Sequence, residues 1–265
     1  MAGSTTDAPP VPLLWTGGWD STFQLLRLLL LDGHAVQPYY LEDETRPSTG
    51  MELATMARLR EALAQRSGHT VEALRPTRYC RVAELPADPA IEQAYAALLE
   101  QSFMGNQYAW LARFCRAQRV HDLQLCIHRD DKAHAALERS VMEDPPGSGI
   151  WRCDPAIAGT PQDVLFGAFR FPLFEWSKLE MARLADEHGW TDLMAMTWFC
   201  HRPRKDLQPC GCCNPCLYTI EEGLGWRIPR RRRAVSALYR TFVLPVRPMA
   251  KALLQQLHGR ASART

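Results

Sequence analysis

Hydrophobic and polar residues follow two different spacings along most of the chain. Short apolar runs predict strands at residues 11–15, 36–41 and 123–127, with weaker candidates at 70–74 and 169–174. Longer segments repeat apolar residues every three or four positions, which predicts helices at 21–31, 51–65, 91–115 with a break near 103–106, 132–142 and 177–188. Because strands alternate with helices, we expect an α/β fold with a parallel sheet flanked by helices.

The last quarter of the chain has a different composition. After residue 195, cysteine, proline and arginine become frequent, and short helices are expected at 234–242 and 250–258. We therefore expect three parts: a disordered tail over 1–10, an α/β domain over 11–195, and a small zinc-binding and helical region over 196–265.

The overall composition excludes several classes of protein. Hydrophobic residues make up 46% and charged residues 23% of the chain, which excludes intrinsic disorder as the main state. The formal charge of +2 is far from that of a strongly basic nucleic-acid coat protein. The first ten residues lack the basic and apolar regions of a secretory signal, and the most apolar run, 25–31, is too short to span a bilayer. We therefore expect a cytoplasmic protein without a membrane segment.

A glycine turn follows the first predicted strand. Two adjacent glycines allow the backbone to approach a ligand, and the helix that begins near Ser21 offers amides that suit a pyrophosphate. The Asp20 carboxylate suits a Mg²⁺ ion that accompanies phosphates, or it orients the turn. The predicted nucleotide-binding residues are Trp15, Thr16, Gly17, Gly18, Asp20, Ser21 and Thr22. The alternative is a structural turn in which Asp20 or Ser21 caps the helix.

Five of the nine cysteines crowd into one segment near the end of the chain. Cys210, Cys213 and Cys216 form a C-x₂-C-x₂-C series, and Cys200 adds a fourth thiolate, a set that suits tetrahedral Zn²⁺. An odd number of cysteines argues against a disulfide framework. An iron–sulfur cluster and unligated buried thiols are the alternatives. The spacing also leaves open whether Cys212 replaces Cys213.

Together, the turn and the cysteine series resemble a known family. The turn resembles the Ser-Gly-Gly-x-Asp-Ser loop of the PP-loop ATP pyrophosphatases, with Thr16 in place of the first serine. Such a loop followed by C-x₈₋₁₀-C-G-x-C-x₂-C is similar to the 7-cyano-7-deazaguanine synthases. Pro172-Leu173, Lys178 and Thr197-Trp198-Phe199-Cys200 match that family in order and approximate spacing. The likeness runs from about residue 11 to about residue 225.

The resemblance implies a fold, a set of ligands and a reaction. The fold is that of the adenine nucleotide alpha hydrolase-like (HUP) domains, with ATP, Mg²⁺ and Zn²⁺ as ligands. In that family ATP activates a small-molecule carboxylate as an acyl adenylate, ammonia converts it to an amide, and a second ATP converts the amide to a nitrile. Asp20 and Lys178 would be catalytic, and Asp130 or Asp131 would contact Mg²⁺ or substrate. The structural alternatives are an exposed lysine at a helix start and an aspartate that caps a helix.

The sequence departs from the family around the substrate pocket. This chain has Met104-Gly-Asn-Gln107 where the family has Pro-Gly-Arg-Asn, and residues 41–46 and 128–134 also differ from the family segments. The ATP half of the reaction is therefore better supported than the identity of the acid. The alternatives are an enzyme that acts on another carboxylate or on the end of a protein, a PP-loop tRNA modifier, and an ATP-binding module without turnover.

A run of arginines at 230–233, with Arg227, suits either RNA phosphates or an acidic partner. Because the net charge is near zero, a solvated helix start is the favoured interpretation, and nucleic-acid binding is not expected. A homodimer is left open.

Aromatic residues and histidines near the motifs are expected to be structural. Tyr39, Tyr40 and Trp15 are expected to pack in the core rather than to stack on a purine. Three histidines do not form a recognisable metal-ligand spacing and are expected to face solvent or to cap helices. They are His121, His128 and His134.

Overall fold

The computed structural model describes residues 8–66, 68–101 and 104–246. The chain divides into two units, Met1–Trp198 and Phe199–Thr265. Most of the tail predicted over 1–10 and all of the helix predicted over 250–258 lie outside the described residues. None of the described helices is both long enough and apolar enough to cross a membrane.

The first unit is an α/β structure built on a five-stranded sheet in the order β3-β2-β1-β4-β7. All neighbouring strands of this sheet run parallel. The strands are β1 (Val11–Leu14), β2 (Val36–Glu42), β3 (Arg78–Arg81), β4 (Leu123–Gln124) and β7 (Phe169–Arg170). The expected parallel sheet flanked by helices is therefore confirmed.

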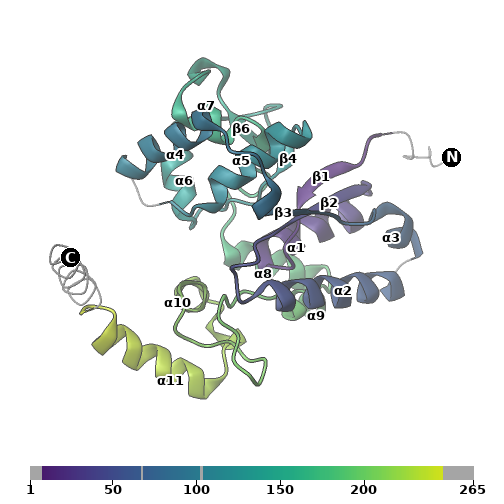
Figure 1. Ribbon diagram of the computed structural model, residues 1–265. Helices are drawn as coiled ribbons and strands as arrows, with labels where there is room; N and C mark the ends of the chain where they lie inside the picture. Colours follow the sequence, from purple (N-terminus) through teal and green to yellow (C-terminus); the bar gives the residue numbers. More distant parts are fainter. Residues whose placement is uncertain (1–7, 67, 102–103, 247–265) are drawn as a thin grey trace, which may run out of the picture. The chain divides into compact units, whose positions relative to one another are not determined.

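Helices cover both faces of this sheet (Figure 1). One face is covered by α1 (Trp19–Leu26), α2 (Thr49–Arg66), α3 (Gly68–Ala73), α8 (Lys178–Glu187) and α9 (Thr191–Met196). The other is covered by α4 (Pro89–Gln101), α5 (Gln107–Gln118), α6 (Lys132–Leu137) and α7 (Pro161–Phe166). Strands β2 and β4 are thus largely buried, which is why they lie in segments that read as short apolar runs. The edge strand β3 is mostly exposed, and its sequence is not apolar.

The strand order places a topological switch point between β1 and β4. The chain leaves β1 toward β2 and β3 and then crosses to the other side of β1, where β4 and β7 lie. In open parallel sheets, ligands bind in the crevice that forms at the carboxyl ends of strands at such a point. A buried hydrogen bond of 2.9 Å from Gln24 Nε2 to Gln124 Oε1 joins α1 to β4 there. The glycine turn predicted to bind a nucleotide follows β1 directly.

The structure corrects the strand predicted at 70–74. Residues Gly68–Ala73 form the helix α3 instead, and Leu74 makes only one isolated parallel bridge, to Val36. Thr70 and Leu74 are buried, four positions apart, and the Thr70 hydroxyl donates to the Leu63 carbonyl at 2.8 Å. The apolar positions are therefore spaced for a helix, and the edge strand is β3, which the sequence did not suggest.

The helix predicted at 132–142 is correct only in its first half. It ends at Leu137 in α6, and Val141–Glu143 forms β5, which pairs antiparallel with β6 (Trp151–Cys153). Glu143 explains part of this difference, because its carboxylate accepts the amides of Gly147 and Gly149 and closes the hairpin loop. The strand predicted at 169–174 is also shorter than expected and ends at Arg170.

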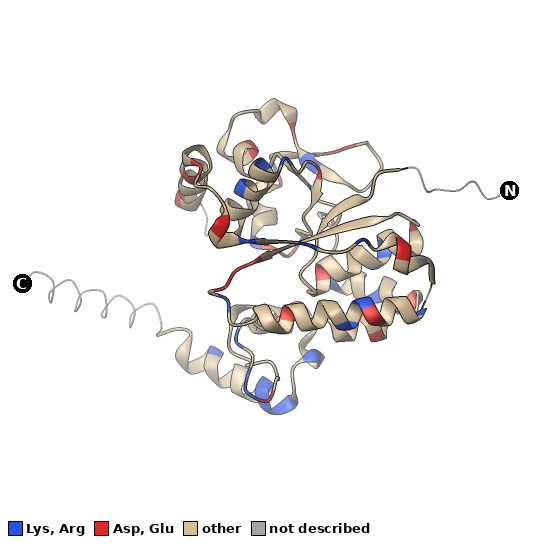
Figure 2. Ribbon diagram, turned by 45° about the vertical axis from the view of Figure 1, so that its right-hand side comes forward, with Lys and Arg blue, Asp and Glu red and all other residues tan. Residues whose placement is uncertain are grey.

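The second unit consists of loops and short helices. They are α10 (Asn214–Glu221), the 3₁₀ turn Gly225–Arg227, α11 (Arg230–Leu238) and a π-helical turn, Tyr239–Val243, that continues α11. Helical structure at 234–242 was expected, but α11 begins earlier, at Arg230. Lys and Arg residues are prominent on this unit (Figure 2).

Candidate functional site

The glycine turn lies between β1 and α1 and is closely packed. Gly17 has φ +67°, a left-handed conformation that favours glycine. A Cβ atom there would lie 3.2 Å from side-chain atoms of both Thr55 and Met56 on α2. The Gly17 carbonyl also accepts a hydrogen bond of 2.9 Å from the Trp198 amide. The backbone of the turn is therefore held in one conformation, which is what a preformed anion site requires.

The start of α1 differs from the expected position. The helix begins at Trp19, and its N-cap residue is Gly18 rather than Asp20 or Ser21. Asp20 and Ser21 thus lie in the first turn of α1, where helix amides lack intrahelical partners and the helix dipole favours an anion. The Ser21 hydroxyl accepts from the Thr16 amide at 3.3 Å and lies 3.4 Å from the Thr16 hydroxyl. Two predicted nucleotide-binding side chains therefore meet in the turn.

Asp20 and Lys178 form an ion pair at this turn. Lys178 Nζ lies 3.6 Å from Asp20 Oδ2, and the two side chains are 14% and 25% exposed. Asp20 Oδ1 is buried and has no hydrogen-bond partner among the described residues. Lys178 begins α8, whose N-cap is Ser177 in a capping box with Glu180. The structural alternative of an exposed lysine does not apply, because this side chain is largely covered.

Trp15 and Thr22, also predicted to bind the nucleotide, face the protein core. Both are fully buried, and the indole Nε1–H of Trp15 donates to the Thr22 hydroxyl at 3.1 Å. Their bond joins the end of β1 to the first turns of α1 beneath the glycine turn. The residues that remain at the turn itself are Thr16, Gly17, Gly18, Asp20 and Ser21. Tyr39 and Tyr40 are buried as expected.

Asp131 and His128, which follow β4, make hydrogen bonds that fix the local backbone. Asp131 is the N-cap of α6, and its carboxylate accepts from the Ala133 amide at 2.9 Å. Asp130 is nearly half exposed, and its Oδ2 lies 4.0 Å from His128 Nδ1. His128 was expected to face solvent or to cap a helix, but it is buried and accepts from the Asp130 amide at 3.2 Å.

A buried acidic residue beside the turn was missed by the sequence analysis. Glu52 on α2 is buried and accepts hydrogen bonds from Tyr40 Oη at 3.0 Å and from Ser48 Oγ at 2.7 Å. Burial and the neighbouring carboxylate raise the pKa of Tyr40 well above its usual value. Arg46 also lies 3.9 Å from Glu52. This network fixes α2 where it packs against Gly17, and no sequence pattern distinguishes Glu52 from a surface glutamate on a helix.

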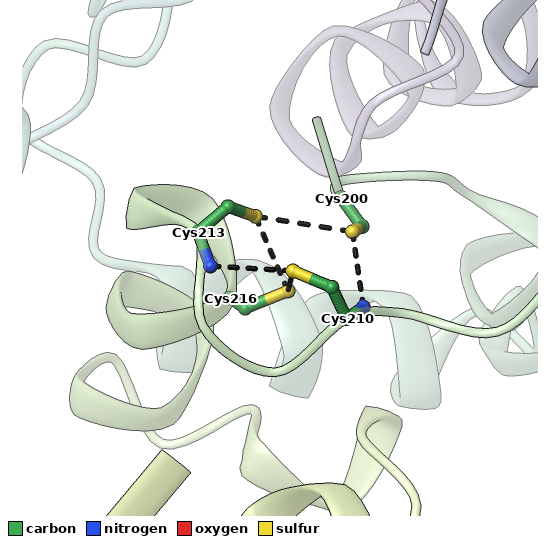
Figure 3. A group of neighbouring side chains, drawn as sticks. All are labelled: Cys200, Cys210, Cys213 and Cys216. Carbon is green, nitrogen blue, oxygen red and sulfur yellow. Dashed lines mark hydrogen bonds between the residues drawn. The ribbon is translucent and has the colours of Figure 1, made fainter. Parts of the chain in front are cut away.

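Four cysteines of the second unit point toward one another (Figure 3). They are Cys200, Cys210, Cys213 and Cys216, and their sulfur atoms all lie within 4.8 Å of one another. Cys213 Sγ lies 3.4 Å from Cys216 Sγ and 3.8 Å from Cys200 Sγ. A tetrahedral ion with metal–sulfur bonds of about 2.3 Å holds its ligands about 3.8 Å apart. The cluster can therefore hold a single metal ion such as zinc.

The backbone around these four thiols forms a tight turn, here called the cysteine knuckle. The amides of Cys212 and Cys213 donate to Cys210 Sγ at 3.3 and 3.2 Å. Gly211 has φ +78°, and a Cβ there would lie 2.8 Å from the Arg232 carbonyl oxygen. Helix α11 braces the turn, because the Arg232 guanidinium donates to the Cys210 carbonyl through Nε at 2.9 Å. Ser236 Oγ also donates to the Gly211 carbonyl.

The geometry separates Cys213 from Cys212. The Cys212 sulfur is not part of the four-thiol group. The Cys213 sulfur lies within the group, 3.4 Å from Cys216 Sγ and 3.8 Å from Cys200 Sγ. Cys213 is therefore the better placed ligand of the two.

The chain matches no family model, no curated protein and no solved structure.

Proposed function

We propose that this protein is an ATP-dependent ligase that adenylates a carboxylate and couples it to ammonia. The observation on which the proposal depends is the Asp20–Lys178 pair, which lies at the glycine turn and at the switch point of a parallel sheet. The resemblance to the PP-loop enzymes supports ATP as the activating substrate. The most specific form of the proposal is the conversion of 7-carboxy-7-deazaguanine to 7-cyano-7-deazaguanine.

The residues at the turn have the chemistry that such a reaction needs. The buried and unpartnered Oδ1 of Asp20 fits a site that binds Mg²⁺, a hard cation that prefers oxygen ligands. When bound, Mg²⁺ would neutralise charge on the phosphates. Lys178 would donate to a phosphate oxygen, and the amides at the start of α1 would bind the pyrophosphate. Thr16 and Ser21 would add hydroxyl donors on the same turn.

These groups act by placing the reactants rather than by covalent catalysis. A carboxylate oxygen of the substrate attacks the α-phosphorus of ATP, and pyrophosphate leaves. Ammonia then attacks the acyl carbon, and AMP leaves with the original carboxylate oxygen. In the nitrile-forming step the amide oxygen attacks the α-phosphorus of a second ATP, and pyrophosphate and one proton leave. Loss of AMP and of the second amide proton then yields the nitrile. The protein lowers the activation free energy by positioning the reactants and by neutralising their charge.

The cysteine knuckle is proposed to bind Zn²⁺ in a structural role. Four thiolates fill a tetrahedral shell and leave no open position for a water or a substrate. The thiol spacing supports one ion rather than an iron–sulfur cluster, in which the cysteines bind separate irons. The metal is expected to stabilise the fold of the second unit.

The direct test is a single incubation of the protein with Mg-ATP, ammonium and 7-carboxy-7-deazaguanine, followed by mass spectrometry. The proposal predicts AMP, pyrophosphate and the amide or nitrile of the acid, all of which are lost in an Asp20→Asn variant. Formation of ADP and phosphate, or AMP formation that does not depend on the acid, would contradict it.

A further inference from the structure

The near-neutral charge of the chain conceals a large difference between its two units. Phe199–Thr265 contains 13 Lys and Arg but only 3 Asp and Glu, a formal charge of +10. Met1–Trp198 contains 18 basic and 26 acidic residues, a formal charge of −8. The near-zero net charge that argued against a polyanion partner therefore arises because the charges of the two units cancel. The second unit by itself is strongly basic. Such asymmetry suggests that the basic unit binds a polyanion such as nucleic acid or a membrane surface.

Two of the three acidic residues of the second unit pair with arginines outside the run. Asp206 pairs with Arg204 at 3.4 Å, and Glu221 pairs with Arg240 at 3.1 Å. Arg230, Arg231 and Arg233 are exposed, and no ion pair involving them is recorded among the described residues. Figure 2 shows Lys and Arg prominent over Asp and Glu on this unit. Three cations at the start of α11 thus face solvent with their charges available.

The position of these arginines is unfavourable for the helix itself. They occupy the first turn of α11, where the helix dipole is positive and no acidic residue is present. Arg232, the third residue of the run, has a structural role because its guanidinium donates to the Cys210 carbonyl. The other three weaken the helix start, and no described residue offers them a compensating ion pair, which points to a role in binding an anion.

We infer that the exposed arginines at the start of α11 bind a single-stranded segment of nucleic acid. Arginine is the residue that best recognises phosphate, and 11 of the 13 cations in this unit are arginines. Trp226, which precedes the run by four residues, is 56% exposed and offers a face on which an unpaired base can stack. This combination of arginine and an exposed aromatic ring favours nucleic acid over an acidic peptide, which has no bases to stack. The inference is independent of the reaction proposed for the glycine turn.

The test uses the full chain with its metal and a fluorescein-labelled RNA of 20 nucleotides. Affinity is measured by anisotropy over a series of KCl concentrations. The triple variant R230Q/R231Q/R233Q is expected to bind at least about tenfold more weakly and to reduce the slope of log K against log [KCl] by about 2. Trp226→Ala is expected to weaken RNA binding by about tenfold.

Three controls make the result decisive. The variant R75Q/R119Q/R139Q removes the same charge from exposed sites of the first unit and should retain the affinity of the parent. Zinc content verifies that each variant keeps the folded knuckle. Equal losses in the two triple variants would overturn the inference, because net charge alone would then explain binding. Unlabelled competitors give a further test. If polyglutamate of equal length, or phosphatidylserine vesicles, displaced the labelled RNA as effectively as unlabelled RNA does, the inference would also be overturned.

Discussion

Lys178 Nζ lies 3.6 Å from Asp20 Oδ2, which joins the start of α8 to the first turn of α1. The two residues are far apart in sequence and meet because β1, β4 and β7 are neighbours in the sheet. Asp20 follows the carboxyl end of β1, and Lys178 lies on the helix that follows β7. This pair places one cation and one anion at the glycine turn, where the proposed ATP chemistry requires both.

Removing either member of the pair is expected to reduce activity more than stability. Lys178→Gln and Asp20→Asn should each lower kcat/KM for ATP by about 100-fold, because preorganised charge at a reacting phosphate is lost. The two side chains are largely covered, so each variant should lower the free energy of unfolding by about 1–3 kcal/mol, which leaves the protein folded for the kinetic assay. Steady-state kinetics and denaturant unfolding measure the two effects separately.

Arg183→Gln provides the matched control for Lys178. Arg183 lies on the same helix and pairs with Glu187 at 3.8 Å, but both side chains are well exposed. Activity and stability should remain at the level of the parent. A full-activity Lys178→Gln variant would show that the pair is only structural.

Residues in the turn and residues beneath it are expected to behave differently. Thr22→Val leaves the buried indole N–H of Trp15 without an acceptor and should destabilise the fold by about 1–3 kcal/mol while the KM for ATP stays unchanged. Ser21→Ala should instead raise the KM for ATP about tenfold, because a hydrogen bond to a charged phosphate is lost. Equal effects of the two changes on KM would contradict this division.

The thiol cluster predicts which cysteine binds the metal. The parent and Cys212→Ser should each contain one zinc per chain by elemental analysis, whereas Cys213→Ser should lose zinc because one of four thiolates is missing. Bound iron with inorganic sulfide would contradict the zinc assignment. If Cys213→Ser retained zinc and Cys212→Ser lost it, Cys212 rather than Cys213 would be the ligand.

Gly211 provides a separate test of the knuckle geometry. Its φ of +78° and the 2.8 Å between a Cβ and the Arg232 carbonyl oxygen make any side chain unfavourable. Gly211→Ala should therefore destabilise the second unit by about 1–3 kcal/mol and weaken zinc binding. Gly147→Ala is the matched control for a positive φ, because φ is +81° there and no atom lies within 4 Å of the added Cβ. Equal zinc affinity in the two variants would contradict the packing argument.

The sequence predicted the features that are set by the spacing of residues within a segment. The alternation of strands and helices predicted the parallel sheet, and the spacing of Cys200, Cys210, Cys213 and Cys216 predicted a group that the structure brings together. The glycine turn was predicted because two adjacent glycines between a strand and a helix allow a tight turn. These features are encoded within short segments, where spacing determines geometry.

Features that depend on tertiary contacts were not predictable in this way. The direction of Thr22 into the core depends on where α1 begins, and that position is set by Gly18 rather than by an aspartate or serine cap. The burial of His128 and Glu52 depends on elements packed against them from elsewhere in the chain. The charge of the second unit was hidden because the net charge was counted over the whole chain.

The measurement that tests the central claim most directly follows the oxygen atoms of the substrate. 7-Carboxy-7-deazaguanine labelled with ¹⁸O in its carboxylate is incubated with the protein, Mg-ATP and ammonium, and the AMP is analysed by mass spectrometry. Attack of the carboxylate on the α-phosphorus predicts AMP that contains one ¹⁸O atom. AMP without the label, or ADP as the product, would contradict carboxylate adenylation.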